Sequence, residues 1–326
     1  MYAGWEEAPG AEAARRARRV DGRAFALVSG LLAVVLSLVL LSWSAGGEED
    51  AAGGGVADDV GAPHGGPSGS SSGTTLPGVP EKPVRPSGQA ALVDNPLYGT
   101  GRLTPRPCPV PELDVDVPAS VEDFLHTVAD CLDDAWSTQF QRAGIPFEPP
   151  DRVFWTEPGV SPCRPYPSQA GAFYCRASTS VYIGVSDVVE KWNGTEDGVV
   201  YASLLAHEYA HHVQGESGLL EYYHEQRELE ADVLDRNAWT RRSELQANCL
   251  AGVFLGSVRV TYPLDGTDLE ILLADARATS DREGGPEEDR THGSAANSER
   301  WMLTGWREQA PGACNTWELE DSPLLE

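Results

Sequence analysis

The chain has 326 residues and a formal net charge of −26, from 24 Lys and Arg against 50 Asp and Glu. A surface this acidic repels a phosphate backbone, so nucleic acid is excluded as a partner. The length suffices for one large domain or two ordinary ones.

The first 43 residues predict a membrane anchor. A basic tail over residues 1–23 precedes the apolar run AFALVSGLLAVVLSLVLLSW, residues 24–43, which carries no charge. A run of this length spans a hydrocarbon core of roughly 30 Å. Basic residues before it and acidic residues after it predict a single-pass protein of the cell membrane, with a cytoplasmic N-terminus and an extracytoplasmic C-terminal domain. The alternative is a signal peptide that is cleaved within SWSAG.

Residues 44–89 predict a disordered linker. Gly, Ser and Pro dominate this segment, and it has too few apolar residues for burial to offset the entropy cost of ordering it. Such a linker holds the rest of the chain away from the membrane, and cleavage near the anchor would release that part. Residues 90–326 have the apolar and aromatic content of a globular domain.

The six cysteines all lie in residues 90–326. An even number of cysteines in an exported domain predicts disulfides, and the sequence by itself leaves their connectivity open. The cysteines are Cys108, Cys131, Cys163, Cys175, Cys249 and Cys314.

The segment GTEDGVVYASLLAHEYAHHVQGESG predicts a helix that carries histidines on one face. Residues 195–197 supply capping and acidic first-turn side chains, and Gly215 and Gly218 supply stop signals. His207 and His211 are one turn apart, so both imidazoles can reach one ion. His212 points about 100° away from them.

Glu208 makes this segment an H-E-x-x-H motif. In that motif the two histidines bind zinc, and the glutamate takes a proton from the water on the metal. The competing interpretation is a helix whose histidines make ordinary hydrogen bonds. A zinc site also requires a third protein ligand.

Two later segments offer a glutamate with an acid or amide one turn beyond it. ELEAD contains Glu228 and Asp232, and ELQAN contains Glu244 and Asn248. Spacing alone slightly favours the first segment, because its second residue is a carboxylate.

Four segments in order, HEYAHHVQ, RRSELQANCLAGVF, THGSAANSERWMLTGW and CNTW, resemble the putative neutral zinc metallopeptidase family. The resemblance covers about Asp130 to Trp317. It implies an α+β, zincin-like metallopeptidase domain, mainly helical with a small sheet, with Zn²⁺ as cofactor. It implies Glu208 as general base, and it makes Glu228 and Asp232 a solvated helix face. The implied zinc ligands are His207, His211 and Glu244.

The chain departs from the family pattern at three positions. Asn248 stands where the family has Asp, Ala210 where it has Gly, and Gly184 where it has Asp. The Asp that Asn248 replaces orients a ligand histidine in the related thermolysin-like layout. An amide oxygen still accepts a hydrogen bond, but without the charge. The departures therefore bear on catalytic rate more than on zinc binding.

The expected function is that of a membrane-anchored zinc peptidase, an endopeptidase rather than an exopeptidase, which acts on peptides or proteins. Glu208 takes the proton of the attacking water and passes it to the leaving amine. The alternative is a zinc-binding ectodomain with weak or no activity that binds a partner. The departures from the family pattern motivate that alternative.

The resemblance also suggests roles for other segments. Residues 181–185, VYIGV, match an edge strand that pairs with extended substrate, and the alternative is a plain core strand. The family pairs Cys249 with Cys314. Cys163 and Cys175 flank a short loop, and Cys108 and Cys131 are the two that remain.

A peptidase requires a hydrogen-bond donor for the developing oxyanion. His292, in THGS, is one candidate for this catalytic role, and the alternative is that residues 291–293 only shape a turn. Residues 268–282 and 298–306 have apolar residues at helical spacing and predict two packing helices. Other candidate donors are the tyrosines Tyr209, Tyr222 and Tyr223.

Overall fold

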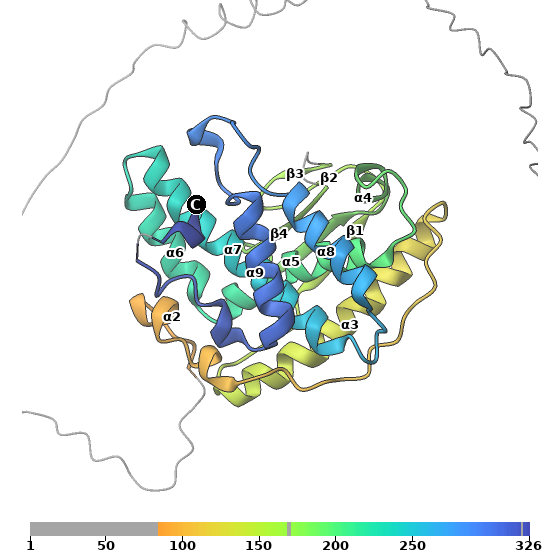
Figure 1. The fold of residues 1–326 in the computed structure, drawn as a ribbon, viewed down its shortest axis with the longest axis horizontal. Helices are drawn as coiled ribbons and strands as arrows, with labels where there is room; N and C mark the ends of the chain where they lie inside the picture. The colour runs from red at the N-terminus through yellow and green to blue at the C-terminus, as the bar shows by residue number, and fades with distance from the viewer. Residues whose placement is uncertain (1–83, 168–170, 321) are drawn as a thin grey trace, which may run out of the picture. The chain divides into compact units, whose positions relative to one another are not determined.

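The computed structural model describes residues 84–167, 171–320 and 322–326. The predicted anchor, residues 24–43, and most of the predicted linker lie outside these ranges. Within the described ranges, no helix has the length and apolar character needed to cross a membrane. The described part is mainly helical with a small sheet, as the sequence predicted (Figure 1).

The elements follow one another with helices at both ends and strands between. The helices are α2 (Gln89–Val93), α3 (Pro118–Ala143), α4 (Val185–Lys191), α5 (Gly198–Glu216), α6 (Leu219–Leu229), α7 (Val233–Val258), α8 (Gly266–Ala278) and α9 (Ala295–Glu308). Short 3₁₀ helices are η1 (Pro96–Thr100), η2 (Glu287–Asp289), η3 (Pro311–Cys314) and η4 (Pro323–Leu325). The strands are β1 (Asp151–Trp155), β2 (Gly159–Val160), β3 (Pro165–Tyr166), β4 (Ala172–Cys175) and β5 (Ser180–Gly184).

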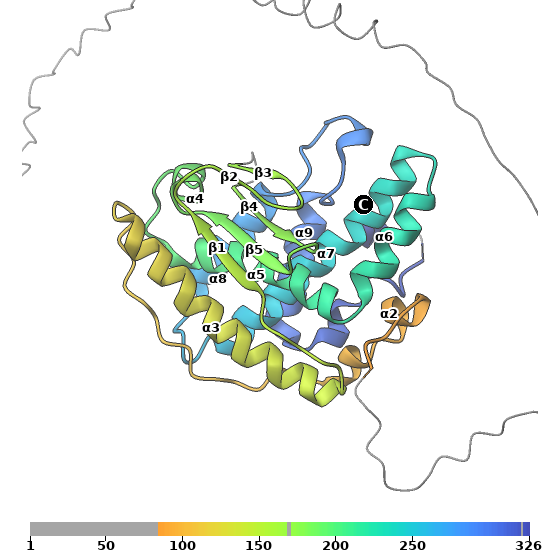
Figure 2. The same cartoon turned by 180° about the vertical axis from the view of Figure 1, so that it is seen from behind.

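The three-stranded sheet has the order β1-β5-β4 (Figure 2). Strand β1 runs parallel to β5, and β4 runs antiparallel to it, so that Tyr182 lies opposite Val153 on one side and Phe173 on the other. All five residues of β5 are buried. The edge-strand prediction for residues 181–185 is therefore wrong, because neighbouring strands pair with both sides of β5.

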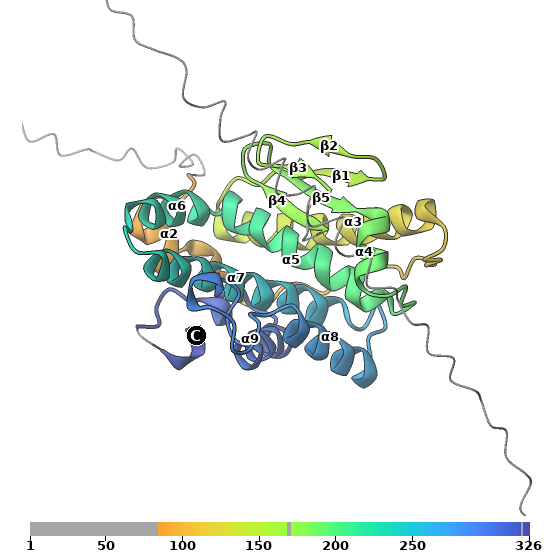
Figure 3. The same ribbon diagram turned by 90° about the horizontal axis from the view of Figure 1, so that it is seen from above.

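Helix α5 lies between the sheet on one side and α7 and α8 on the other (Figure 3). Its side chains are buried on nearly all faces, as expected for a helix in a core. Gly218 follows α5 in the left-handed region, with φ of 80°. The predicted cap differs in detail: Asp197 makes no side-chain bond to the first turn, and the Thr195 hydroxyl donates to its carboxylate instead.

Helices α7 and α9 approach each other closely through glycines. A Cβ on Gly305 would collide with the carbonyl oxygen of Cys249, and one on Gly252 would collide with that of Met302. Only residues without a side chain permit this backbone distance. Helices α8 and α9 correspond to the two predicted packing helices. The close packing brings the loop before α9 against the middle of α7.

Three disulfides join the pairs that the sequence analysis favoured. They are Cys108–Cys131, Cys163–Cys175 and Cys249–Cys314. The last bridge links the C-terminal segment to α7, the helix that also carries Glu244. It therefore limits how far this helix and the chain end can separate.

Candidate metal centre

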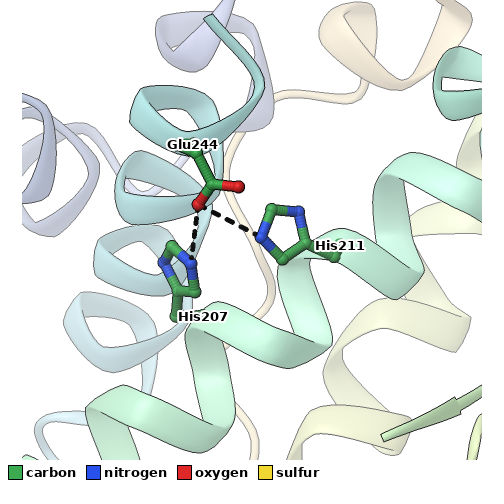
Figure 4. A group of neighbouring side chains, drawn as sticks. All are labelled: His207, His211 and Glu244. Carbon is green, nitrogen blue, oxygen red and sulfur yellow. Dashed lines mark ion pairs between the residues drawn. The ribbon is translucent and has the colours of Figure 1, made fainter. Parts of the chain in front are cut away.

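The side chains of His207, His211 and Glu244 converge in space (Figure 4). The histidines project from α5 and the glutamate from α7. The Nε2 atoms of His207 and His211 lie 3.2 and 3.4 Å from the same oxygen of Glu244. One donor atom from each of the three lies within 4.8 Å of the others. In the described part of the chain, no other group of His, Cys, Asp and Glu side chains is this close.

Two amide side chains orient the imidazoles. His207 Nδ1 lies 2.9 Å from Asn248 Oδ1, and His211 Nδ1 lies 2.9 Å from Gln214 Oε1. Because an amide oxygen only accepts, each Nδ1 carries a proton, and Nε2 is the ring nitrogen left to face Glu244 and to serve as a metal ligand. Asn248 thus occupies the position expected for the orienting residue.

Sequence reasoning missed Gln214. Its own amide nitrogen donates to Ser243 O and to Gln246 Oε1, both at 2.9 Å, so its oxygen is held toward His211. All of these polar groups are buried apart from His211, which is partly exposed. The signal was present in the HHVQ segment, because residues three apart on a helix are neighbours.

The electrostatics of the three side chains favour a positive charge between them. Burial alone would raise the pKa of Glu244, but the two imidazoles hold it well below its usual range. Burial likewise lowers the pKa of His211, but the Glu244 carboxylate outweighs it and raises the pKa to about 9. Two imidazoles and one carboxylate are also a ligand set of catalytic zinc sites, so the residues present fit this ion.

Glu208 lies beside the three side chains and is only 8 % exposed. A cavity of about 130 Å³ opens next to it, and its lining includes His207, Asn248 and His292. A cavity needs only about 10–15 Å³ of such volume to hold one water molecule, so this one has room for water. Glu208, His207, Asn248 and His292 therefore line one space.

The second glutamate pattern lies elsewhere. Glu228 is exposed near the end of α6. Asp232 caps α7, where its carboxylate accepts a hydrogen bond from Leu234 N at 2.7 Å. The structure thus places Glu244, and not Glu228, beside the histidines.

Other side chains near the motif have structural partners. His212 is fully buried, its Nε2 lies 2.8 Å from Glu148 O, and burial lowers its pKa to about 4. Tyr209 donates to Asp133 at 2.7 Å. Tyr223 donates to a threonine hydroxyl of α7. Of the candidate donors, His292 is the one that lines the cavity.

A mainly helical domain with a small sheet, in which an H-E-x-x-H helix meets a glutamate of a later helix, defines the class of zinc metallopeptidases. The chain belongs to the putative neutral zinc metallopeptidase family, whose sequence profile matches residues 115–317. Membership in this family implies zinc as the cofactor.

Two curated relatives are similar to part of the chain. Uncharacterized protein YpfJ of Escherichia coli strain K12 is 30% identical over 203 residues, which cover 60% of this chain and 70% of the relative. Uncharacterized protein Rv2575 of Mycobacterium tuberculosis strain H37Rv is 30% identical over 190 residues, which cover 52% of this chain and 62% of the relative. No solved structure matches the chain.

Replacing Asn248 by Ala is expected to weaken zinc binding by about 10- to 100-fold, because His207 loses the acceptor that fixes its ring. Asn248→Asp restores the family residue and is expected to bind zinc at least as tightly as the parent. Competition with a chromophoric chelator measures both affinities. Equal affinities in all three proteins would show that this hydrogen bond does not support the metal site.

Proposed function

We propose that the protein is a zinc-dependent peptidase, and specifically an endopeptidase, that hydrolyses peptide bonds of peptide or protein substrates. One observation carries the proposal. The Nε2 atoms of His207 and His211 face one oxygen of Glu244, directly beside the buried carboxyl group of Glu208. A site that served only to stabilise the fold would not require an acid at that position.

The proposed roles follow from the positions of the side chains. His207, His211 and Glu244 hold the ion. A bound zinc ion supplies Lewis-acid polarisation of the scissile carbonyl and lowers the pKa of water toward about 7. Glu208 takes the proton of the attacking water and returns it to the leaving amine. His292, on the wall of the same cavity, donates a hydrogen bond to the carbonyl oxygen as negative charge develops there.

We also propose that the domain acts outside the cell membrane and is anchored by residues 24–43. The uncharged apolar run between a basic and an acidic flank supports this location. The three disulfides support it as well, because such bonds persist mainly in oxidising compartments.

Metal removal tests the proposed activity. Treatment with 1,10-phenanthroline is expected to lower casein cleavage by at least about 100-fold, because the carbonyl loses its polarising group, and added zinc is expected to restore cleavage. Mass spectrometry of the products identifies internal cleavage sites if the enzyme is an endopeptidase. Circular dichroism serves as the control that the disulfide-bonded fold survives chelation. A folded, zinc-loaded protein that cleaves nothing would contradict the proposal and favour the partner-binding alternative.

A further inference from the structure

The carboxyl group of Asp281 binds the backbone of the loop that carries His292. Its Oδ1 accepts hydrogen bonds from the backbone N–H groups of Thr291 and His292, both at 2.9 Å. Its Oδ2 accepts one from Gly293 N at 2.8 Å. The backbone N–H of Asp281 donates to Gly293 O at 3.0 Å. With only 6 % of its side chain exposed, Asp281 fixes three successive peptide groups around His292.

The same turn also contacts α7 and α9. Gly293 has φ of 82°, and a Cβ there would lie 2.8 Å from a methyl group of Leu245, the residue after Glu244. The carbonyl of His292 accepts a hydrogen bond from Ser298 Oγ at 3.3 Å. The backbone of the turn therefore has little freedom relative to the helix that supplies the third metal-ligand candidate.

The imidazole of His292 is held less directly than its backbone. Its side chain is 52 % exposed, and its Nδ1 lies 2.9 Å from Thr291 Oγ1 but 3.9 Å from Asp281 Oδ1. It nevertheless lines the cavity that His207 and Glu208 also line. Asp281 therefore constrains the position of the His292 ring mainly by fixing the backbone that carries it.

We propose that Asp281 is a positioning residue, which sets the His292 imidazole at the cavity beside His207 and Glu208. The inference rests on the proposed function, in which His292 donates to the scissile carbonyl oxygen. A donor of this kind is effective when it is already in place, and a displacement of about 1 Å can cost about 100-fold in rate.

Kinetics of single and double variants test the inference with a quenched-fluorescent peptide that the parent cleaves. His292→Ala is expected to lower kcat by about 100- to 1,000-fold. Asp281→Ala is expected to lower kcat by about 10- to 100-fold with little change in KM. Asp281→Asn keeps one acceptor oxygen and is expected to recover part of this loss. The double variant with both alanines is expected to be no slower than His292→Ala, because Asp281 acts through the histidine.

Asp265→Ala is the matched control. Asp265 also accepts backbone hydrogen bonds, from Thr267 N and Asp268 N at the start of α8, but it does not line the cavity. This variant is expected to keep the parent kcat. Losses that multiply in the Asp281/His292 double variant, or a parent-like kcat in Asp281→Ala, would overturn the inference.

A second measurement does not depend on activity. In the protein loaded with Co²⁺ in place of zinc, paramagnetic NMR shifts of the His292 ring protons report the position of the ring relative to the metal. The inference expects large shifts in the parent that shrink in Asp281→Ala and Asp281→Asn at unchanged metal content. Unchanged shifts would overturn it whatever the activity. If the parent has no peptidase activity but its His292 shifts shrink in the Asp281 variants, the result would support the positioning role and refute the proposed function.

Discussion

Replacement of Glu208 by Gln leaves zinc in the protein and lowers peptide hydrolysis by about 100- to 10,000-fold, the range of general acid–base catalysis. The amide keeps the shape of the side chain but cannot accept the proton of the attacking water. Glu208 is not one of the three converging side chains, so metal content is expected to stay unchanged. Elemental analysis gives zinc per chain, and initial rates on a fluorogenic peptide give kcat.

Glu216→Gln is the matched control for this result. Glu216 is a second buried acid on α5, but it pairs with Arg85 at 2.8 Å and not with the metal-site side chains. This variant is expected to keep the parent rate. A Glu208→Gln protein as active as the parent would rule out the assigned base and the mechanism built on it.

Replacement of Glu244 by Ala removes zinc from the folded protein. The site loses its one carboxylate and with it the negative charge that both imidazoles face at 3.2 and 3.4 Å. Removing a residue that only orients a ligand typically lowers metal affinity by about 10- to 100-fold. The loss of zinc affinity in Glu244→Ala is expected to be larger. Zinc per chain after dialysis, measured by elemental analysis, gives the result.

The control for Glu244→Ala is Glu228→Ala, the other glutamate with a suitable local pattern. Glu228 is exposed on α6 and lies outside the converging group. Its variant is expected to keep one zinc per chain. Zinc lost in Glu228→Ala but kept in Glu244→Ala would reverse the ligand assignment.

The departure at Asn248 bears on the partner-binding alternative. A zinc-binding ectodomain without activity would need an oriented His207 as much as a peptidase does, so the orienting contact is expected under either interpretation. The structure keeps it, with Asn248 Oδ1 2.9 Å from His207 Nδ1. An uncharged acceptor raises the basicity of the imidazole less than a carboxylate does. Under the proposed function, we therefore expect a peptidase slower than one with Asp at this position.

Local sequence rules and the family resemblance predicted much of this protein. The spacing of His207 and His211 placed both imidazoles on one face of a helix, because 3.6 residues make one turn. Apolar periodicity predicted α8 and α9. The family motifs indicated the class, the Cys249–Cys314 pair and the choice of Glu244. The membrane anchor remains a prediction, since residues 24–43 lie outside the described ranges.

Tertiary structure decided what depends on contacts between distant residues. Residues 181–185 were predicted as a strand, and residues 181–184 belong to β5, but its place between β1 and β4 depends on strand order, which composition does not encode. Spacing alone slightly favoured Glu228 over Glu244, and the packing of α7 against α5 set which one meets the histidines. The contacts of Gln214 with α7 and of Asp281 with the His292 loop also form only when separate segments meet. Periodicity fixes which way a side chain points from its own helix, whereas a site requires several elements to bring their side chains to one point.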